Sequence, residues 1–203
     1  MKLLPILALL SSLALIAAAN TACVPSAYSR PTLEVKHDKF RPDFDSVQLT
    51  VPDALQVGPA TAGSFASAGA DTFDIWLLAM PPRGGVVDDK VFFRLSHFSP
   101  NGWEYLKCHP LAFLIDGQPI NPGETEHDGT VGRGYVSEYI KFVAPLDLVD
   151  RMARGRSVEG ELCNTEFTFK PETLRLMRDF VSTVRTGVVP QQPVAPREGT
   201  LGM

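Results

Sequence analysis

The sequence predicts a mainly β protein of the α+β class, with an antiparallel, β-sandwich-like body, a short helix and a C-terminal amphipathic helix. Short apolar or alternating segments separated by turn residues occupy the chain from Leu33 to Val143. Helical periodicity begins only after Pro145. Runs of strands followed by helices favour a sandwich or α+β arrangement over repeated strand–helix–strand units. We therefore expect a single β-rich domain over residues 33–187.

The first residues have the composition of a secretory signal. Met1-Lys2 is a cationic head, and the apolar run after it ends in small residues. A retained membrane anchor is the alternative, because the run lies at the short end of the spanning range of roughly 17–25 residues. Two cleavage points compete. Ala17-Ala18-Ala19 fits the ordinary signal peptidase pattern, whereas a cut before Cys23 makes residues 1–22 the signal peptide.

Thr21 and Ala22, directly before Cys23, resemble the lipobox of bacterial lipoproteins. The resemblance implies that Cys23 is the lipidated first residue of the mature chain and holds the protein to a membrane of the cell envelope. Residues 23–32 are short, polar and proline-broken, which suits a tether between the anchor and the folded body. The alternative localisation is a soluble periplasmic or secreted protein.

Cysteine parity favours the same interpretation. The chain has three cysteines, and an odd thiol in a secreted protein needs an explanation. If Cys23 carries lipid, Cys108 and Cys163 remain as an even pair in an oxidising compartment. We expect these two to form a structural disulfide.

The strands are expected where residues alternate or form short, dense apolar runs. They cover residues 33–40, 47–51, 73–80, 90–98, 103–108, 111–115, 135–143, 157–162 and 166–169. Segments 57–71 and 121–134 are expected to be loops, the first of them disordered, because they are rich in Gly and small or polar residues. Asp116-Gly117 predicts a type I′ hairpin turn, since both central residues must take positive φ.

Two helices are expected near the C-terminus. The first covers residues 147–154 and ends at Gly155. The second begins at Pro171, where a first-turn proline is tolerated, and ends before Gly187. Its apolar stripe recurs at helical spacing and contains Leu174, Leu176, Met177, Phe180, Val181 and Val184. Residues 188–203 contain three prolines and no periodicity, so we expect a disordered tail.

The second half of the chain has a recurring order of parts. The turn Ile115-Asp116-Gly117 is followed by an E-x-I-x-F strand formed by Glu138, Ile140 and Phe142, then a short helix, a hairpin and the final amphipathic helix. This order resembles a pattern found in uncharacterised bacterial envelope proteins. The resemblance supports the predicted fold. It implies no activity, because no agreed catalytic or binding residue belongs to the pattern.

Composition and motifs exclude several function classes. The net charge of −4 offers no basic face for nucleic acid. The sequence lacks a phosphate loop, a dinucleotide fingerprint, a nucleophile elbow and the histidine spacing of zinc sites. The segment 124–128 combines carboxylates with His127, yet a contiguous polar loop is more often simply solvated. We therefore expect no cofactor and no metal.

Three functional hypotheses remain. The first is a non-enzymatic interaction or structural role in the envelope, with an envelope protein as partner. The second is a small-molecule or glycan-binding domain; its weak candidate residues are Trp103, Tyr105, His97 and Glu138. Strand aromatics are more often core residues, and Glu138 falls on the inward face of its strand, where a carboxylate needs partners. The third is a hydrolase whose site lies near His97, Cys108 and Glu138, with no catalytic residue assigned.

Overall fold

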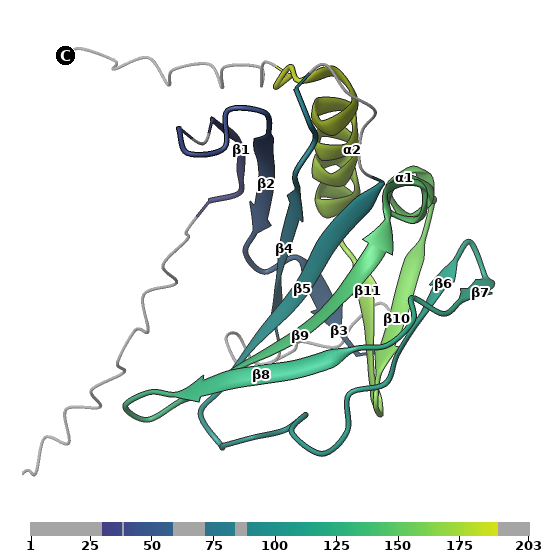
Figure 1. The fold of residues 1–203 in the computed structure, drawn as a ribbon. Coiled ribbons are helices and arrows are strands. Elements are labelled where there is room, and N and C mark those ends of the chain that lie inside the picture. Colours follow the sequence, from purple (N-terminus) through teal and green to yellow (C-terminus); the bar gives the residue numbers. More distant parts are fainter. Residues whose placement is uncertain (1–29, 38, 59–71, 84–88, 191–203) are drawn as a thin grey trace, which may run out of the picture.

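Two antiparallel β-sheets packed together, with two helices, form the folded body (Figure 1). The computed structural model describes residues 30–37, 39–58, 72–83 and 89–190. The predicted fold class is confirmed. The predicted signal peptide, most of the tether, most of the Gly- and Ala-rich loop and most of the C-terminal tail lie outside the described residues.

The larger sheet has six strands, which are all antiparallel to their neighbours. Their spatial order is β1 (Thr32–His37), β2 (Asp45–Val51), β4 (Phe73–Ala79), β5 (Lys90–Ser99), β9 (Val136–Pro145) and β8 (Glu126–Val131). The smaller sheet has five strands, also antiparallel, in the order β3 (Leu55–Val57), β11 (Thr165–Phe169), β10 (Val158–Leu162), β6 (Leu111–Ile115) and β7 (Gln118–Ile120).

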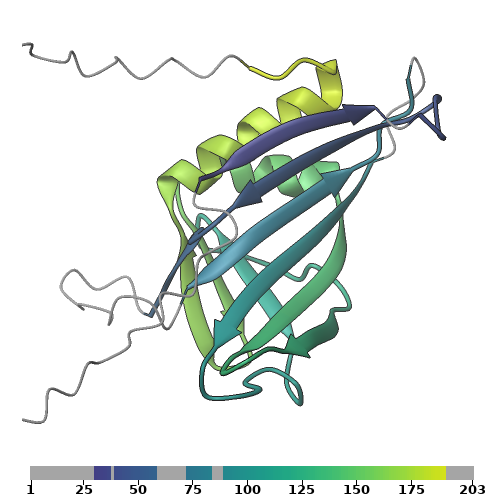
Figure 2. The same ribbon diagram turned by 90° about the vertical axis from the view of Figure 1, so that its left-hand side faces the viewer.

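The core lies between the sheets and beneath the helices. Alternate residues of each strand point inward, as a period of two requires. Phe93 of β5 stacks on Phe142 of β9 with ring centroids 4.7 Å apart, and Phe113 of the smaller sheet lies 6.0 Å from Phe142. Helix α1 (Leu146–Arg154) and helix α2 (Pro171–Thr186) contribute their apolar stripes to this core. In Figure 2 the larger sheet passes in front of the helices, so they lie on its inner side.

Helix boundaries follow the predicted stop signals. Pro171 occupies the first turn of α2, and Gly187 ends it in the left-handed conformation with φ of 72°. A residue without Cβ adopts this conformation at little cost. Gly155 ends α1, and its amide donates to the carbonyls of Arg151 and Met152.

The predicted hairpin is confirmed. β6 and β7 pair across Asp116 and Gly117, whose φ angles are 51° and 78°. Asp116 also accepts hydrogen bonds from the amides of Arg156 and Ser157 at 2.8 and 3.0 Å, so the turn is tied to the start of β10. These bonds hold the pKa of the Asp116 carboxyl below its usual value, the Ser157 amide being the largest cause.

Two assignments of secondary structure were wrong. Residues 103–108 form no strand and belong to the loop from Pro100 to Pro110, which we call the β5–β6 loop. Two of its backbone amides donate hydrogen bonds to the side chain of Glu138 on β9, and they do not pair with a neighbouring strand. Residues 121–134 are not all loop, because they contain β8. The inward positions of this edge strand face polar groups and a tryptophan, so the strand has few apolar residues. Its sequence therefore shows no hydrophobic alternation. The short strand β3 was also missed.

Candidate functional site

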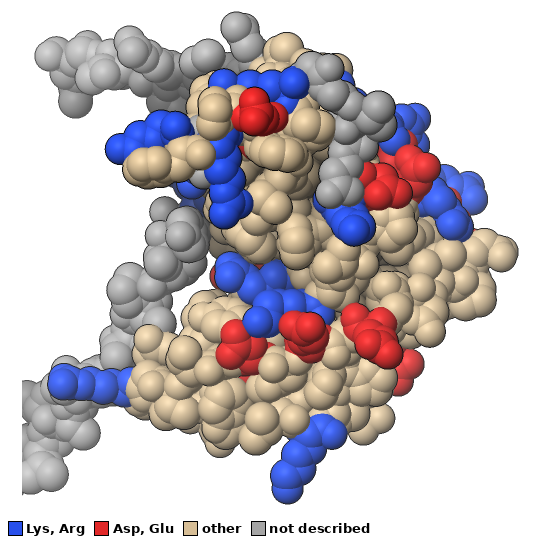
Figure 3. Space-filling view, in the orientation of Figure 1, with Lys and Arg blue, Asp and Glu red and all other residues tan. Residues whose placement is uncertain are grey.

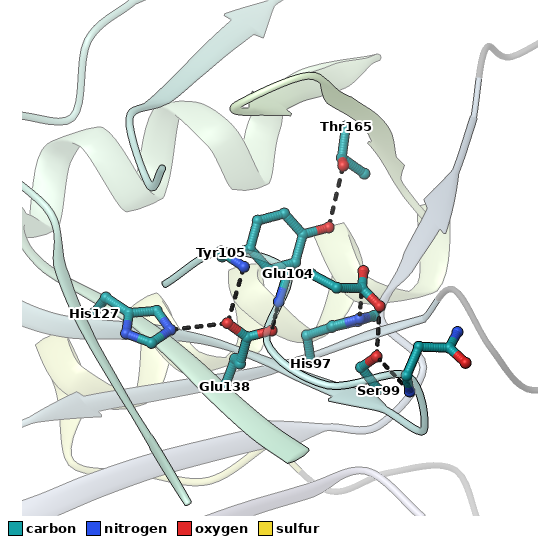
Figure 4. Close-up of polar contacts among 8 residues, drawn as sticks. His97, Ser99, Glu104, Tyr105, His127, Glu138 and Thr165 are labelled. Atoms are coloured by element: carbon teal, nitrogen blue, oxygen red, sulfur yellow. Dashed lines mark hydrogen bonds and ion pairs between the residues drawn. The ribbon is translucent and has the colours of Figure 1, made fainter. Parts of the chain in front are cut away.

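Glu138 is the centre of a buried polar cluster at one end of the sandwich (Figure 4). Its side chain is 0% exposed. The carboxylate accepts hydrogen bonds from the amides of Glu104 and Tyr105 at 2.8 and 2.9 Å, and His127 Nε2 lies 2.9 Å from Oε1. A buried carboxylate is tolerated when its oxygens are hydrogen-bonded. Glu138 therefore holds the β5–β6 loop against strand β9.

His97 lies directly opposite Glu138 in the β5–β9 register. It is 2% exposed, and its ring lies 5.0 Å from that of Phe73 and 5.4 Å from that of Tyr105. Its Nε2 is 3.2 Å from Glu104 Oε2, although neither ring nitrogen makes a well-oriented hydrogen bond to a described residue. The contact with Glu104 is weak, because a misaligned hydrogen bond contributes little. His97 therefore serves chiefly as a packed core ring.

Ser99 and Glu104 extend the cluster, as the dashed lines of Figure 4 show. Ser99 Oγ donates to Glu104 Oε1 at 2.5 Å and accepts from the amide of Asn101 at 3.1 Å. The order is therefore hydroxyl, carboxylate, imidazole. A serine nucleophile needs the imidazole beside the hydroxyl, with the carboxylate behind it. This order, together with the complete burial of Ser99, suits a loop anchor and not a nucleophile.

Tyr105 joins the loop to the other sheet. It is 4% exposed, and its hydroxyl donates to Thr165 Oγ1 of β11 at 3.1 Å. The ring packs in the core beside Phe73, with centroids 5.8 Å apart. The β5–β6 loop is thus bound to the larger sheet through Glu138 and to the smaller sheet through Tyr105.

The predicted disulfide between Cys108 and Cys163 is confirmed. Their Cα atoms are 5.8 Å apart, and the bond joins the β5–β6 loop to the β10–β11 turn. The hydrolase hypothesis placed a site near His97, Cys108 and Glu138. With its sulfur in the disulfide, Cys108 offers no thiol, whereas His97 and Glu138 do lie side by side. A structural disulfide indicates an extracytoplasmic protein.

Trp103 is the one predicted binding residue with a substantial solvent-exposed surface, 40%, whereas Tyr105, His97 and Glu138 are buried. Its ring lies over Gly129, where a Cβ would come within 2.6 Å of the ring. Two other strand aromatics lie on a different surface. Trp76 and Tyr139 flank Arg94 on the outer face of the larger sheet, with the guanidinium 4.8 and 5.1 Å from their ring centroids.

The polar segment around His127 is divided between two faces of β8. His127 points inward to Glu138, whereas Asp128 points outward and pairs with Lys141 at 2.9 Å. The hydrogen bond from Lys141 is the largest cause that lowers the pKa of Asp128. Within the described ranges no group of three or more His, Cys, Asp or Glu side chains is arranged to hold a metal ion. Figure 3 shows acidic and basic side chains lying next to one another across this side of the molecule.

A groove with a volume of about 770 Å³, which the sequence analysis did not predict, lies on the smaller sheet. We call it the sheet groove. Its outward-facing floor residues are Ala112, Leu114, Pro119, Glu159, Glu161, Glu166 and Thr168. The signal that could have revealed it is the alternation in Val158–Leu162, where Glu159 and Glu161 share the face opposite to the core. Concave surfaces of this size are the usual location of ligand sites.

Comparison with known proteins returns no relative: no protein-family description, no curated protein and no solved structure matches this chain. Among the described residues, no helix has the length and apolar character needed to cross a membrane.

Proposed function

We propose that this chain is a lipid-anchored protein of a bacterial cell envelope whose folded body acts by binding a partner and not by catalysis. Cys23 would carry the lipid, and the residues after it would act as the tether. The body would present its binding surface to an envelope protein. This proposal keeps the first hypothesis from the sequence and assigns no catalytic residue.

The observation that carries the proposal is the use of the cysteines. The chain has three, and the disulfide takes Cys108 and Cys163. Cys23 is the remaining cysteine, and it stands after an apolar signal and the lipobox-like Thr21-Ala22. The disulfide also supports an oxidising compartment, which agrees with export. The polar cluster supports a binding role indirectly, because Glu138, which fastens the loop, is fully buried and shielded from a substrate.

The test is Cys23→Ser, compared with wild type in a bacterial host fed an alkyne-tagged fatty acid. We expect wild type to incorporate the label and to sediment with membranes. The variant should lose the label and appear in the soluble periplasmic fraction. Stable anchoring needs more than a single acyl chain. A variant without any lipid group should therefore leave the membrane fraction almost completely.

A matched control is Ser26→Ala in the tether, which should leave both label and fractionation unchanged. Unlabelled wild-type protein would contradict the lipid anchor. A Cys23→Ser variant that still sediments with membranes after a high-salt wash would contradict it as well, because another segment would then hold the protein.

A further inference from the structure

The sheet groove has an apolar half and an acidic half. Ala112, Leu114 and Pro119, on β6 and β7, form the apolar half. Glu159 and Glu161 on β10 and Glu166 on β11 form the acidic half. The register joins the halves directly, because Glu159 lies opposite Leu114 and Glu161 lies opposite Ala112. A ligand in this groove therefore meets an apolar strip and a row of carboxylates side by side.

Several acidic side chains of the surface have a cationic partner, and the three groove glutamates do not. Elsewhere Asp45 pairs with Arg83 at 2.6 Å, and Asp53 pairs with Lys170 at 2.6 Å. Within the described part of the chain, none of the three groove glutamates has an ion pair, and no Lys, Arg or His lines the groove. The groove thus concentrates negative charge, and no cationic side chain among the described residues balances it.

The sheet geometry also leaves like charges in direct opposition. Glu161 and Glu166 are register partners across β10 and β11. Like charges placed directly opposite one another destabilise an antiparallel pair. A positive group from a partner between the two carboxylates would remove this repulsion, so the groove gains more from a cationic ligand than an isolated glutamate would.

We infer that the sheet groove binds an extended, basic segment of a partner protein, with Lys or Arg at alternate positions. This inference rests on the proposed function, because it names the chemistry of the partner that the envelope-anchored body would bind. Alternate side chains of an extended segment are about 7 Å apart on one face. Glu159 and Glu161, two residues apart on β10, have the same spacing.

The long aliphatic stems of Lys and Arg fit the mixed character of the groove. Such side chains lay their methylene groups along apolar surface and keep the charged head in a polar environment. Their stems would cover Ala112 and Leu114, and their heads would reach Glu159, Glu161 and Glu166. Nucleic acids and anionic lipid surfaces do not fit, because both are negatively charged.

The test measures peptide binding to the purified, disulfide-bonded protein by fluorescence anisotropy at low salt. The probe is a labelled heptapeptide, Gly-Lys-Val-Lys-Val-Lys-Gly, and the control peptide has Gln in place of each Lys. The groove variant combines Glu159→Gln, Glu161→Gln and Glu166→Gln. The charge-matched control combines Glu124→Gln, Glu126→Gln and Glu172→Gln, none of which lines the groove.

We expect the groove variant to raise the Kd of the lysine peptide about tenfold, because three solvent-exposed ion pairs with modest individual contributions are lost. The control variant should change it less than twofold, and the glutamine peptide should bind about tenfold more weakly than the lysine peptide. Circular dichroism and thermal melting verify that both variants are folded.

Three results would overturn the inference: no measurable binding of the lysine peptide, equal loss of affinity in both triple variants, or displacement of the peptide by spermine at lower concentration than by unlabelled peptide. The last would make the groove a site for small polyamines. The anchor is tested separately, since Cys23→Ser should leave peptide affinity unchanged. A chain that binds peptide but is not lipidated would contradict the anchor alone.

Discussion

The buried polar cluster and the sheet groove both depend on carboxylates, yet they use them in opposite ways. In the cluster, Glu138 is fully buried, accepts two amide hydrogen bonds and contacts His127. In the groove, Glu159, Glu161 and Glu166 are exposed and have no ion pair with the described residues. A carboxylate whose oxygens are already engaged contributes to structure, whereas one left without a partner remains available to a ligand.

This difference predicts which substitutions affect folding and which affect binding. Changes at the cluster and at the disulfide beside it should lower the free energy of unfolding. Changes to groove glutamates should leave it unchanged or raise it.

Removing the disulfide should have the largest effect. The double variant Cys108→Ser/Cys163→Ser releases a cross-link between residues separated by 55 positions. The chain-entropy estimate for a loop of this size is a loss of about 4 kcal/mol in the free energy of unfolding. Urea denaturation of the double variant and wild type measures it, with Cys23→Ser as the control that leaves the disulfide in place. A loss below about 1 kcal/mol would mean that the bond adds little to the packing around it.

Glu138→Ala should come next. The substitution leaves the amides of Glu104 and Tyr105 and the ring of His127 without their acceptor inside the protein. The expected loss is about 3 kcal/mol, because each buried donor without a partner costs free energy. Urea denaturation measures this loss, and hydrogen exchange should detect faster exchange in the β5–β6 loop. Glu172→Ala, on the exposed face of α2, is the control and should change little.

Gly160→Ala probes the floor of the groove from the core side. A Cβ at this position would lie 2.3 Å from the ring of Phe167 and 3.1 Å from that of Phe113. Overpacking of this kind costs about 2 kcal/mol. Thermal unfolding measures the effect, and Glu161→Ala on the outward face of the same strand is the comparison. Equal stability of Gly160→Ala and wild type would show that both rings can move aside.

Glu161→Gln should give the smallest change, and one of opposite sign. It removes the repulsion with Glu166, its register partner, and should raise the free energy of unfolding by about 0.5 kcal/mol at low salt. Added salt should abolish the difference by screening the charges. If Glu161→Gln destabilised the protein, Glu161 would have a structural partner, and the contrast with Glu138 would fail.

Much of the fold could be predicted because its signals are local. A short, dense apolar run marked β4, alternation marked β9, and Asp116-Gly117 marked the hairpin. Cysteine parity predicted the Cys108–Cys163 bond. The inward position of Glu138 was also correct, since it follows from the period of the strand.

The features that were missed depend on contacts between distant residues. β8 gave no apolar alternation because His127 faces Glu138 and Gly129 lies under Trp103. Residues 103–108 of the β5–β6 loop have the composition of a strand. Their amides bond to Glu138, which is distant in the sequence, so the local pattern could not indicate this contact. The groove depends on the alignment of β10 with β6 and β11, which a single sequence does not specify.

The disulfide also makes the stability of the body depend on the compartment that it occupies. In a reducing cytosol the thiols of Cys108 and Cys163 stay apart, so a newly made chain lacks about 4 kcal/mol of its final stability. On the export route that we propose, such a chain would be easier to unfold and to thread through a secretion channel. The bond can close only after residue 163 has been delivered to an oxidising environment, when every strand but β11 has been exported. On that proposed route, the disulfide would stabilise the folded state only after transport.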